Sequence, residues 1–201
     1  VADLLKRYDL DGIHFDDYFY PFPNPNYKLK DQATYRKYRT TEKDLSDWRR
    51  GNVNKMIFGI YETILQINPK VKFGVSPAGV WRNIYDSPLG SQTRGGYTSY
   101  DHLNADSRTW LSEGWVDYLV PQIYFSTKLE TVNYRTLTRW WDKNHFDRHL
   151  YIGHAAFKIY FDSDKGWYNK SELPEQLRYN RTFKNIKGSA FFRAESFMRN
   201  R

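Results

Sequence analysis

Two adjacent carboxylates, Asp16 and Asp17, are the first candidates for chemistry, and they end a predicted strand over residues 11–16. Side chains alternate across a strand, which places His14 and Asp16 on one face and apolar side chains on the other. An imidazole beside a carboxylate at a strand end can transfer or hold protons. We therefore expect Asp16 in a catalytic pocket. Asp17 should point off the pocket axis or into the next loop, where anchoring an Arg or a backbone N–H is an equal alternative.

Further polar and aromatic side chains follow the other predicted strands. Including the first strand, the candidates for contacting a substrate are His14, Tyr18, Ser76, Trp81, Arg82, Asn83, Gln122, Tyr124 and His154. Each has a structural alternative. Tyr124 could pack in the interior, Arg82 could pair with a loop carboxylate, and Trp81 could pack a loop. Glu195 is the only Glu near a predicted strand end and is the candidate for a second catalytic carboxylate.

Cofactor and metal chemistry have little support in the sequence. The chain contains no Cys, which excludes disulfides, thiolate catalysis and Cys-based zinc sites. A metal held by His14, Asp16 and His154 is a minor alternative, because no His-x-His or His-Glu-x-x-His run is present. No strand is followed by a glycine-rich phosphate-binding turn. We expect neither a metal nor a cofactor.

The elements that must position these residues alternate along the chain. Strands are expected at about 11–16, 71–76, 117–124, 150–154 and 189–193, with helices at 1–8, 45–67, 106–111, 129–141 and 171–184. The two longest loops are expected at 18–43 and 77–104. Strands that alternate with helices predict an α/β fold with a parallel sheet, as in doubly wound sheets and (β/α)8 barrels. Strands with one apolar and one small or polar face favour the barrel.

The predicted strands make up only part of such a barrel. Five strands are too few to close a (β/α)8 barrel, and the chain ends too soon after the fifth for its covering helix. The chain also begins inside a predicted helix without an initiator Met. We expect residues 1–201 to be a single domain, a partial catalytic barrel cut at both ends.

The amino-acid composition indicates which classes of binding partner the chain suits. With 40% apolar and 27% charged residues the chain resembles a soluble globular protein, and neither a signal peptide nor a membrane span is visible. The net charge of +8 comes from scattered Lys and Arg, which favours a solvated basic surface over a nucleic-acid groove. Seven Trp and seventeen Tyr are many, and aromatic-lined clefts suit sugar rings or stacked bases.

Several stretches resemble the bacterial glycosyl-hydrolase-like family 10. They are Asp-Gly-Ile-His-Phe-Asp-Asp-Tyr-Phe-Tyr-Pro at 11–21, Phe-Gly-Val-Ser-Pro at 73–77, Trp-Arg-Asn at 81–83, Asp-Ser-Arg at 106–108 with the Trp at 110, and the run from Gly-Trp-Val-Asp-Tyr at 114–118 into Pro-Gln-Ile-Tyr at 121–124. The resemblance extends to about residue 153. It implies a (β/α)8 TIM-type barrel of which this chain is the carboxyl-terminal part, about strands 4 to 8. Residues 11–16 would be the fourth strand, and the first three strands and the last helix would lie outside the chain.

The resemblance also implies an activity and a location. Members of this family are extracytoplasmic, often lipoproteins, and include an enzyme that cleaves peptide-free peptidoglycan glycan strands. We therefore expect a secreted or envelope-anchored glycosidase, with a polysaccharide substrate, no nucleic-acid partner, and a lipid anchor possible in the missing amino-terminal part. The alternatives are a carbohydrate-binding barrel without catalysis and, less favoured, a metal-dependent hydrolase.

A second comparison concerns the proton donor. Asp11, His14, Asp16 and Tyr18 have the spacing of the Asp-x-x-Asp-x-Asp-x-Glu signature of chitinase-type barrels, which use the substrate's acetamido group as nucleophile. Here His14 stands at the middle Asp, and Tyr18 stands where the acid Glu would be. By this comparison Asp16 would orient or stabilise the substrate rather than protonate it, and the general acid stays unnamed.

Overall fold

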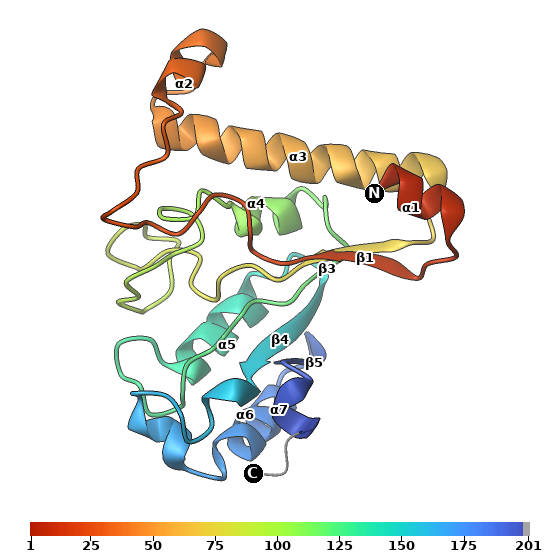
Figure 1. Ribbon diagram of the computed structural model, residues 1–201. Coiled ribbons are helices and arrows are strands. Elements are labelled where there is room, and N and C mark those ends of the chain that lie inside the picture. Colours follow the sequence, from red (N-terminus) through yellow and green to blue (C-terminus); the bar gives the residue numbers. More distant parts are fainter. Residues whose placement is uncertain (199–201) are drawn as a thin grey trace.

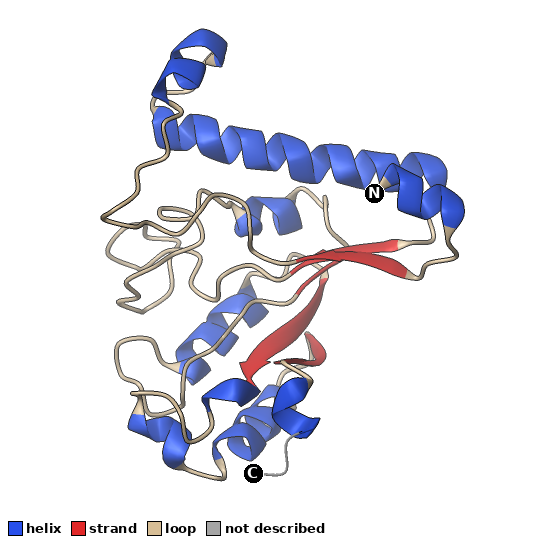
Figure 2. Cartoon of the chain, viewed as in Figure 1, coloured by secondary structure: helices blue, strands red, loops and turns tan. Residues whose placement is uncertain are grey.

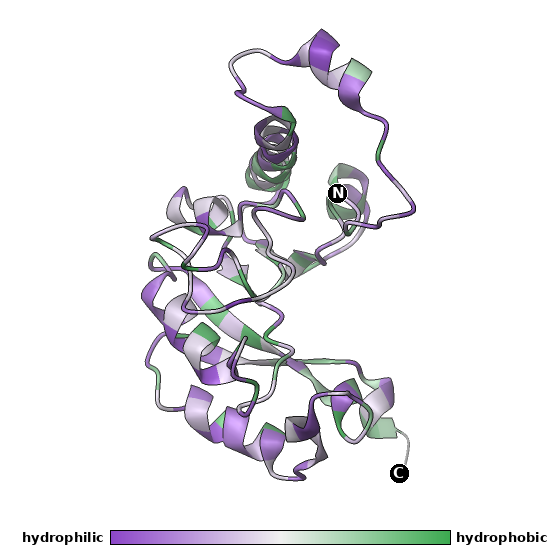
Figure 3. Ribbon diagram, turned by 90° about the vertical axis from the view of Figure 1, so that its left-hand side faces the viewer, coloured by the Kyte–Doolittle hydropathy of each residue, from purple (hydrophilic) through white to green (hydrophobic). Residues whose placement is uncertain are grey.

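The computed structural model describes residues 1–198 and contains a parallel five-stranded sheet (Figures 1 and 2). Its strands are β1 (Gly12–Phe15), β2 (Lys72–Val75), β3 (Tyr118–Leu119), β4 (His149–Ala155) and β5 (Ile186–Phe192). They pair in chain order, β1-β2-β3-β4-β5, without the reversal of order that marks a doubly wound sheet. Viewed from the loop side, the elements follow an open arc (Figure 3). The α/β fold is therefore confirmed, and its sheet is consistent with a partial TIM-like barrel.

The helices follow the expected alternation with a few differences. They are α1 (Ala2–Arg7), α2 (Gln32–Tyr38), α3 (Leu45–Ile67), α4 (Ser107–Ser112), α5 (Tyr134–Lys143), α6 (Glu172–Asn180) and α7 (Glu195–Met198), with short 3₁₀ turns η1 (Ala156–Lys158) and η2 (Lys165–Tyr168). Asp44 begins α3 by accepting a hydrogen bond from the Asp47 backbone N–H, and Asn68 ends it before Pro69. Helix α2 was not expected inside the long loop at 18–43, and α6 ends earlier than expected.

The third strand is shorter than predicted. Only Tyr118 and Leu119 pair as a regular ladder, although residues 117–124 were expected to be extended. Pro121 has no N–H to donate to a neighbouring strand, so the ladder stops there. Gln122 resumes the contact through isolated bridges to Ala78 and Gly153. This segment therefore still carries Gln122 to the carboxyl-terminal edge of the sheet.

The core lies between the helices and one face of the sheet. Phe73, Leu119 and Ile152 are fully buried on this face, and Ile57 of α3 and Leu137 of α5 pack in the same cluster. Burying each such side chain is worth roughly 1.5–3 kcal/mol. The predicted alternation of apolar and polar faces is thereby confirmed, and the opposite face is left to small and polar residues.

A glycine on that inner face makes room for an aromatic ring. A Cβ at Gly74 would lie 2.1 Å from the Tyr118 ring, so only glycine allows the ring to lie flat over β2. Tyr118 also packs edge-on against Tyr151, with ring centroids 5.7 Å apart. These rings border a cavity of about 690 Å³ whose other lining residues include Lys72 and His149, at the starts of their strands. His14, Ser76 and Val120 line it as well, so the cavity extends along the inner face from the starts of the strands to the ends of β2 and β3.

The loops that follow the strands lie on the left of Figure 1, at the carboxyl-terminal ends of the strands, with those after β1 and β2 below α3. The loop after β1 and the loop after β2 are the longest, as expected. Among residues 1–198, no helix is both long and apolar enough to cross a membrane. The sheet thus presents one end, rich in loops, at which polar side chains from several strands meet.

Candidate functional site

The ends of the first three strands meet at the side chain of Gln122. Its amide nitrogen donates to the Asp16 carboxylate over 2.7 Å and to the backbone carbonyl of Ser76 over 2.9 Å. The same oxygen of Asp16 accepts a second hydrogen bond, from the Asp17 backbone N–H, over 2.9 Å. Asp16 is otherwise exposed. The structure therefore brings Asp16, Ser76 and Gln122 together, as their positions at strand ends predicted.

Asp17 is the more buried of the two carboxylates. Asp17 is 9% exposed. It lies at the bend after β1, where the Phe19 N–H donates to the Asp17 carbonyl. Burial and then the negative charge of Asp16 raise the pKa of Asp17 to about 6, against a partly opposing hydrogen bond from Gln122. Asp17 was expected off the pocket axis, but it lies beside Asp16 and Gln122. Its burial therefore favours the protonated form of this carboxyl group.

His14 is held from both ring nitrogens. Nε2 is 2.7 Å from the Ser76 hydroxyl, Nδ1 is 3.1 Å from the Tyr118 hydroxyl, and the Tyr118 ring stacks on the imidazole. Partial burial lowers the pKa of His14, and the charge of Asp16 only partly offsets this. The imidazole is therefore neutral near pH 7, with one nitrogen donating and the other accepting.

Tyr118 was not among the predicted site residues, although the alternation that selected Gln122 places both on the same face. Burial, and then the neighbouring Tyr151 and Asp117, raise the pKa of the Tyr118 hydroxyl, so it stays protonated. Through its hydroxyl and its stacked ring, Tyr118 fixes the orientation of His14. The sequence signal that could have found it is the small Gly74, which pairs with Tyr118 in the register of β2 and β3.

Tyr124 completes the group on the other side of the carboxylates. Burial, and then the charges of Asp16 and Asp17, raise the pKa of its hydroxyl well above the ordinary value. Its ring packs edge-on against Phe157, with centroids 5.9 Å apart. Tyr18 is 83% exposed and close enough to contribute to the same shift. Tyr124 thus faces the carboxylates, and Tyr18 is open to a ligand.

Trp81 has a structural environment. Its indole N–H donates to the Asp106 carboxylate over 2.9 Å, its ring stacks on Trp140, and the side chain is 5% exposed. Asp106 also caps α4 through the Thr109 backbone N–H. These contacts favour the loop-packing alternative for Trp81 over contact with a substrate.

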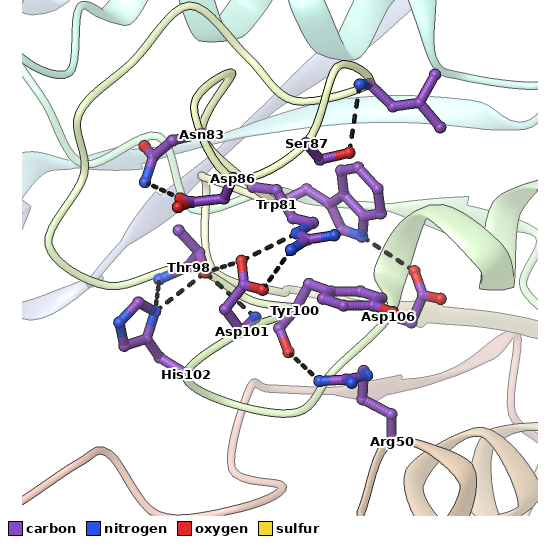
Figure 4. A network of polar contacts seen from close by, with 12 residues as sticks. Arg50, Trp81, Asn83, Asp86, Ser87, Thr98, Tyr100, Asp101, His102 and Asp106 are labelled. Atoms are coloured by element: carbon purple, nitrogen blue, oxygen red, sulfur yellow. Dashed lines mark hydrogen bonds and ion pairs between the residues drawn. The ribbon is translucent and has the colours of Figure 1, made fainter. Parts of the chain in front are cut away.

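Arg82 and Asn83 also stabilise the loop between β2 and α4. Arg82 forms an ion pair with Asp101 over 2.8 Å, and Asn83 accepts hydrogen bonds from Thr93 and from the Gly95 backbone N–H. Figure 4 shows Asn83 and Asp101 within this network. The network holds a long loop at the mouth of the sheet, and it does not bring Arg82 or Asn83 to the carboxylates.

His154 does not lie at the mouth, which corrects its prediction as a substrate contact. The side chain is fully buried between the sheet and the helices, on the face that carries Leu150 and Ile152. Its Nδ1 lies 2.9 Å from the Gln176 side-chain oxygen, and its Nε2 lies 3.0 Å from the Ser189 hydroxyl. Burial lowers the pKa of His154 to about 4. A neutral, hydrogen-bonded interior histidine is the result.

Glu195 lies at the start of α7 and pairs with Arg193. Both line a separate cavity with Phe157 and Tyr160, outside the group around Asp16. The geometry therefore gives Asp17, rather than Glu195, as the carboxylate nearest to Asp16. Within residues 1–198, no three His, Cys, Asp or Glu side chains are grouped so that they could hold a metal ion. The minor alternative built on His14, Asp16 and His154 fails in particular because His154 is on the opposite face.

Comparison with known proteins adds an independent line of evidence. The family described as glycosyl hydrolase-like 10 matches residues 1–169. Glycosyl hydrolase YngK of Bacillus subtilis is 42% identical over 203 residues, covering 100% of this chain and 40% of the relative. Glycosyl hydrolase DigH of Escherichia coli K12 is 41% identical over 202 residues, covering 97% of this chain and 46% of the relative. The chain thus spans less than half the length of these relatives.

Proposed function

The chain belongs to the glycosyl hydrolase-like 10 family, and we propose that it carries the catalytic carboxylates of a glycoside hydrolase. The relatives named above are glycosyl hydrolases, which supports a glycosidase-like role. The observation that carries the proposal is the contrast between two neighbouring carboxyl groups. Asp16 is exposed and accepts two hydrogen bonds, whereas Asp17 is buried and its pKa is raised to about 6. Two neighbouring carboxyl groups in such different environments can take different roles, with the buried one as the proton donor.

In this mechanism Asp17 protonates the oxygen of the leaving sugar. Its raised pKa keeps a proton available at mildly acidic pH, which glycoside hydrolysis requires of its general acid. As the glycosidic bond breaks, Asp16 stabilises the positive charge that develops on the sugar, or orients an acetamido group that attacks it. A water molecule then attacks the same carbon and returns a proton to Asp17, which completes the hydrolysis. Gln122 holds the Asp16 carboxylate in place for either role.

The neighbouring side chains suit a sugar. The neutral His14 uses both ring nitrogens on Ser76 and Tyr118 and so orients their hydroxyls, while Tyr124 and Tyr18 offer hydroxyls beside the carboxylates. We propose an acetylamino-sugar polysaccharide as the substrate, with peptidoglycan glycan strands as the specific candidate. The net charge of +8 favours a glycan that carries carboxylates, as muramic acid does.

An extracytoplasmic place of action follows from that substrate. Peptidoglycan lies outside the cytoplasmic membrane, so the protein would act in the periplasm, at the outer membrane or in the medium, either secreted or held by a lipid anchor. Fractionation of cells, followed by detection of the protein, tests this part of the proposal. Recovery of all the protein in the cytoplasm would contradict it.

The test of the activity is turnover of peptide-free glycan strands by the full-length protein. We expect Asp16→Asn and Asp17→Asn each to lower kcat/KM by about 10²- to 10⁴-fold, the usual contribution of a positioned acid or base. Asp3→Asn is the matched control, because Asp3 is exposed on α1, which precedes the amino-terminal end of β1, whereas Asp16 follows its carboxyl-terminal end. Turnover that is unchanged in both site variants would overturn the roles of Asp16 and Asp17. Binding of the strands without any turnover would instead indicate a carbohydrate-binding protein.

A further inference from the structure

A third cavity lies between the loop after β1 and the loop after β2. Its volume is about 660 Å³, and its walls come from residues 20–32, the start of α3 and residues 97–104. Tyr20, on its wall, follows Asp17 by only two intervening residues. The segment that carries the two carboxylates therefore continues directly into the wall of this cavity. The roles proposed above for Asp16 and Asp17 do not use it.

Exposed aromatic rings form much of its wall. Phe22, Tyr27 and Tyr97 are 49%, 57% and 54% exposed, although a folded chain usually buries such rings. Phe22 and Tyr97 stand edge to face, with centroids 5.9 Å apart, so their relative orientation is fixed. Exposed apolar surface gathered in a concave place is typical of a ligand site.

A buried polar group in the cavity wall has no partner. Asn104 is 4% exposed, and its side-chain oxygen accepts no hydrogen bond from any residue in the described part of the chain. Leaving such an acceptor unpaired costs about 1–3 kcal/mol, so it points to a group that arrives from outside. Asn104 also has a φ of 53°, a conformation that Asn tolerates better than most residues.

His102 supplies a donor in the same wall. Its Nδ1 accepts from the Thr98 backbone N–H over 3.2 Å, so in the neutral ring the hydrogen is on Nε2. That N–H has no partner among residues 1–198. The cavity thus combines aromatic faces with one free donor and one free acceptor, which is the combination that a sugar ring with hydroxyl or acetamido groups can satisfy.

Charge also favours a glycan. The lining contains no Asp or Glu, and its Arg49 is already bound to Asp31 through two hydrogen bonds of 2.8 and 2.7 Å. Lys28 is the lining cation without an ion pair in the described chain. The charge of the lining therefore suits a neutral sugar or a sugar with a carboxylate, and it disfavours a cationic ligand.

We propose that this cavity is a second glycan-binding subsite, which holds a pyranose unit of the same polysaccharide away from the bond that is cleaved. The inference rests on the proposed function for the identity of the ligand. The glycan would run from the carboxylates past Tyr20, with one sugar face on Tyr97 or Phe22 and its polar groups on Asn104 and His102. Long strands would then gain binding energy that short oligosaccharides cannot reach.

The test compares long peptide-free glycan strands with a disaccharide-length substrate in the full-length protein. We expect Tyr97→Ala and Phe22→Ala each to lower the ratio of kcat/KM for long over short substrates by about tenfold, since each removes one aromatic contact. Tyr8→Ala is the matched control. Tyr8 is 54% exposed, as Tyr97 is, but it lies at the end of α1, before β1 begins. It should leave the ratio unchanged.

Binding measured by calorimetry separates this inference from the proposed function. If the protein binds glycan strands without hydrolysing them and Tyr97→Ala weakens that binding about tenfold, the subsite stands and the hydrolase proposal fails. If the protein hydrolyses the strands and both variants retain the wild-type ratio and affinity, the subsite is wrong. Asn104→Asp adds an independent variant, because it keeps the shape of the side chain and places a charge in the wall. It should weaken binding, and unchanged affinity would contradict the role of Asn104.

Discussion

Gln122 donates to the carboxylate of Asp16 over 2.7 Å, although 106 positions separate the two residues in the chain. The contact exists because β1 and the segment after β3 end at the same edge of a parallel sheet. The second hydrogen of the same amide goes to the Ser76 carbonyl at the end of β2. One side chain therefore ties together the ends of three successive strand segments and sets the direction of the exposed carboxylate.

Replacing Gln122 by Ala should uncouple Asp16 from the neighbouring strands. We expect kcat/KM on glycan strands to fall about 10- to 100-fold, as for other losses of a hydrogen bond that orients a reacting group. Stability should fall by only about 0.5–1.5 kcal/mol, the usual net worth of such bonds. Gln92→Ala, at an exposed position in the loop after β2, is the control. Wild-type activity in Gln122→Ala would show that the orientation of Asp16 does not matter.

The proton of Asp17 should limit activity at higher pH. With a pKa of about 6, Asp17 is mostly protonated below that pH and mostly ionised above it, so kcat/KM should decline as pH rises through about 6. The charge of Asp16 contributes to the raised value, so Asp16→Asn should lower the pKa of Asp17. Carbon-13 NMR titration of the Asp17 carboxyl in the wild type and in Asp16→Asn measures both. A titration midpoint near 4 in the wild type would remove Asp17 from the role of general acid.

The alternation of side chains along a strand predicts which residues share a face only where the strand is regular. It identified His14, Asp16 and Gln122 on one face, and these side chains are near one another in the structure. It could not describe Asp17, because the chain bends after β1 and the alternation no longer holds there. The burial that raises the pKa of Asp17 depends on contacts with residues distant in sequence. No local pattern contains that information.

His154 shows a different kind of error. Leu150 and Ile152 are two positions apart and buried on the helix-facing side, so the same alternation places His154 with them. His154 was predicted to contact a substrate because it is the last residue of the predicted strand at 150–154. For Trp81 the sequence left two roles open. A loop tryptophan that donates to a carboxylate such as Asp106 looks the same in sequence as one that stacks on a sugar. Only the position of Asp106 in space separates the two.

His154 should make the fold sensitive to acid. Its pKa is about 4 in the folded chain and near 6.5 when unfolded, so its contribution to stability is complete above pH 6.5 and is lost as pH falls toward 4. The full loss is on the order of 3 kcal/mol. In His154→Gln this part of the pH dependence should disappear, as measured by urea unfolding at pH 7 and pH 5. The contribution of Asp17 to the pH dependence of stability has the opposite sign, because its raised pKa favours the folded state at low pH. This contribution is the same in the wild type and in His154→Gln, so it cancels in the comparison. An equal change between the two pH values in both proteins would contradict this assignment.

Gly74 should be the least replaceable glycine of the inner face. A Cβ there would lie 2.1 Å from the Tyr118 ring, which would have to leave β2 and with it the hydrogen bond to His14. We expect Gly74→Ala to cost about 1–3 kcal/mol of stability through overpacking, and to lower activity because His14 loses its orientation. Gly59→Ala is the matched control, since a Cβ at that position in α3 meets nothing within 4 Å. It should be neutral or stabilising by up to about 1 kcal/mol, because Ala favours a helix over Gly. Thermal unfolding and turnover of both variants test this prediction. Equal stability of the two would show that the Tyr118 ring does not need the space that Gly74 leaves.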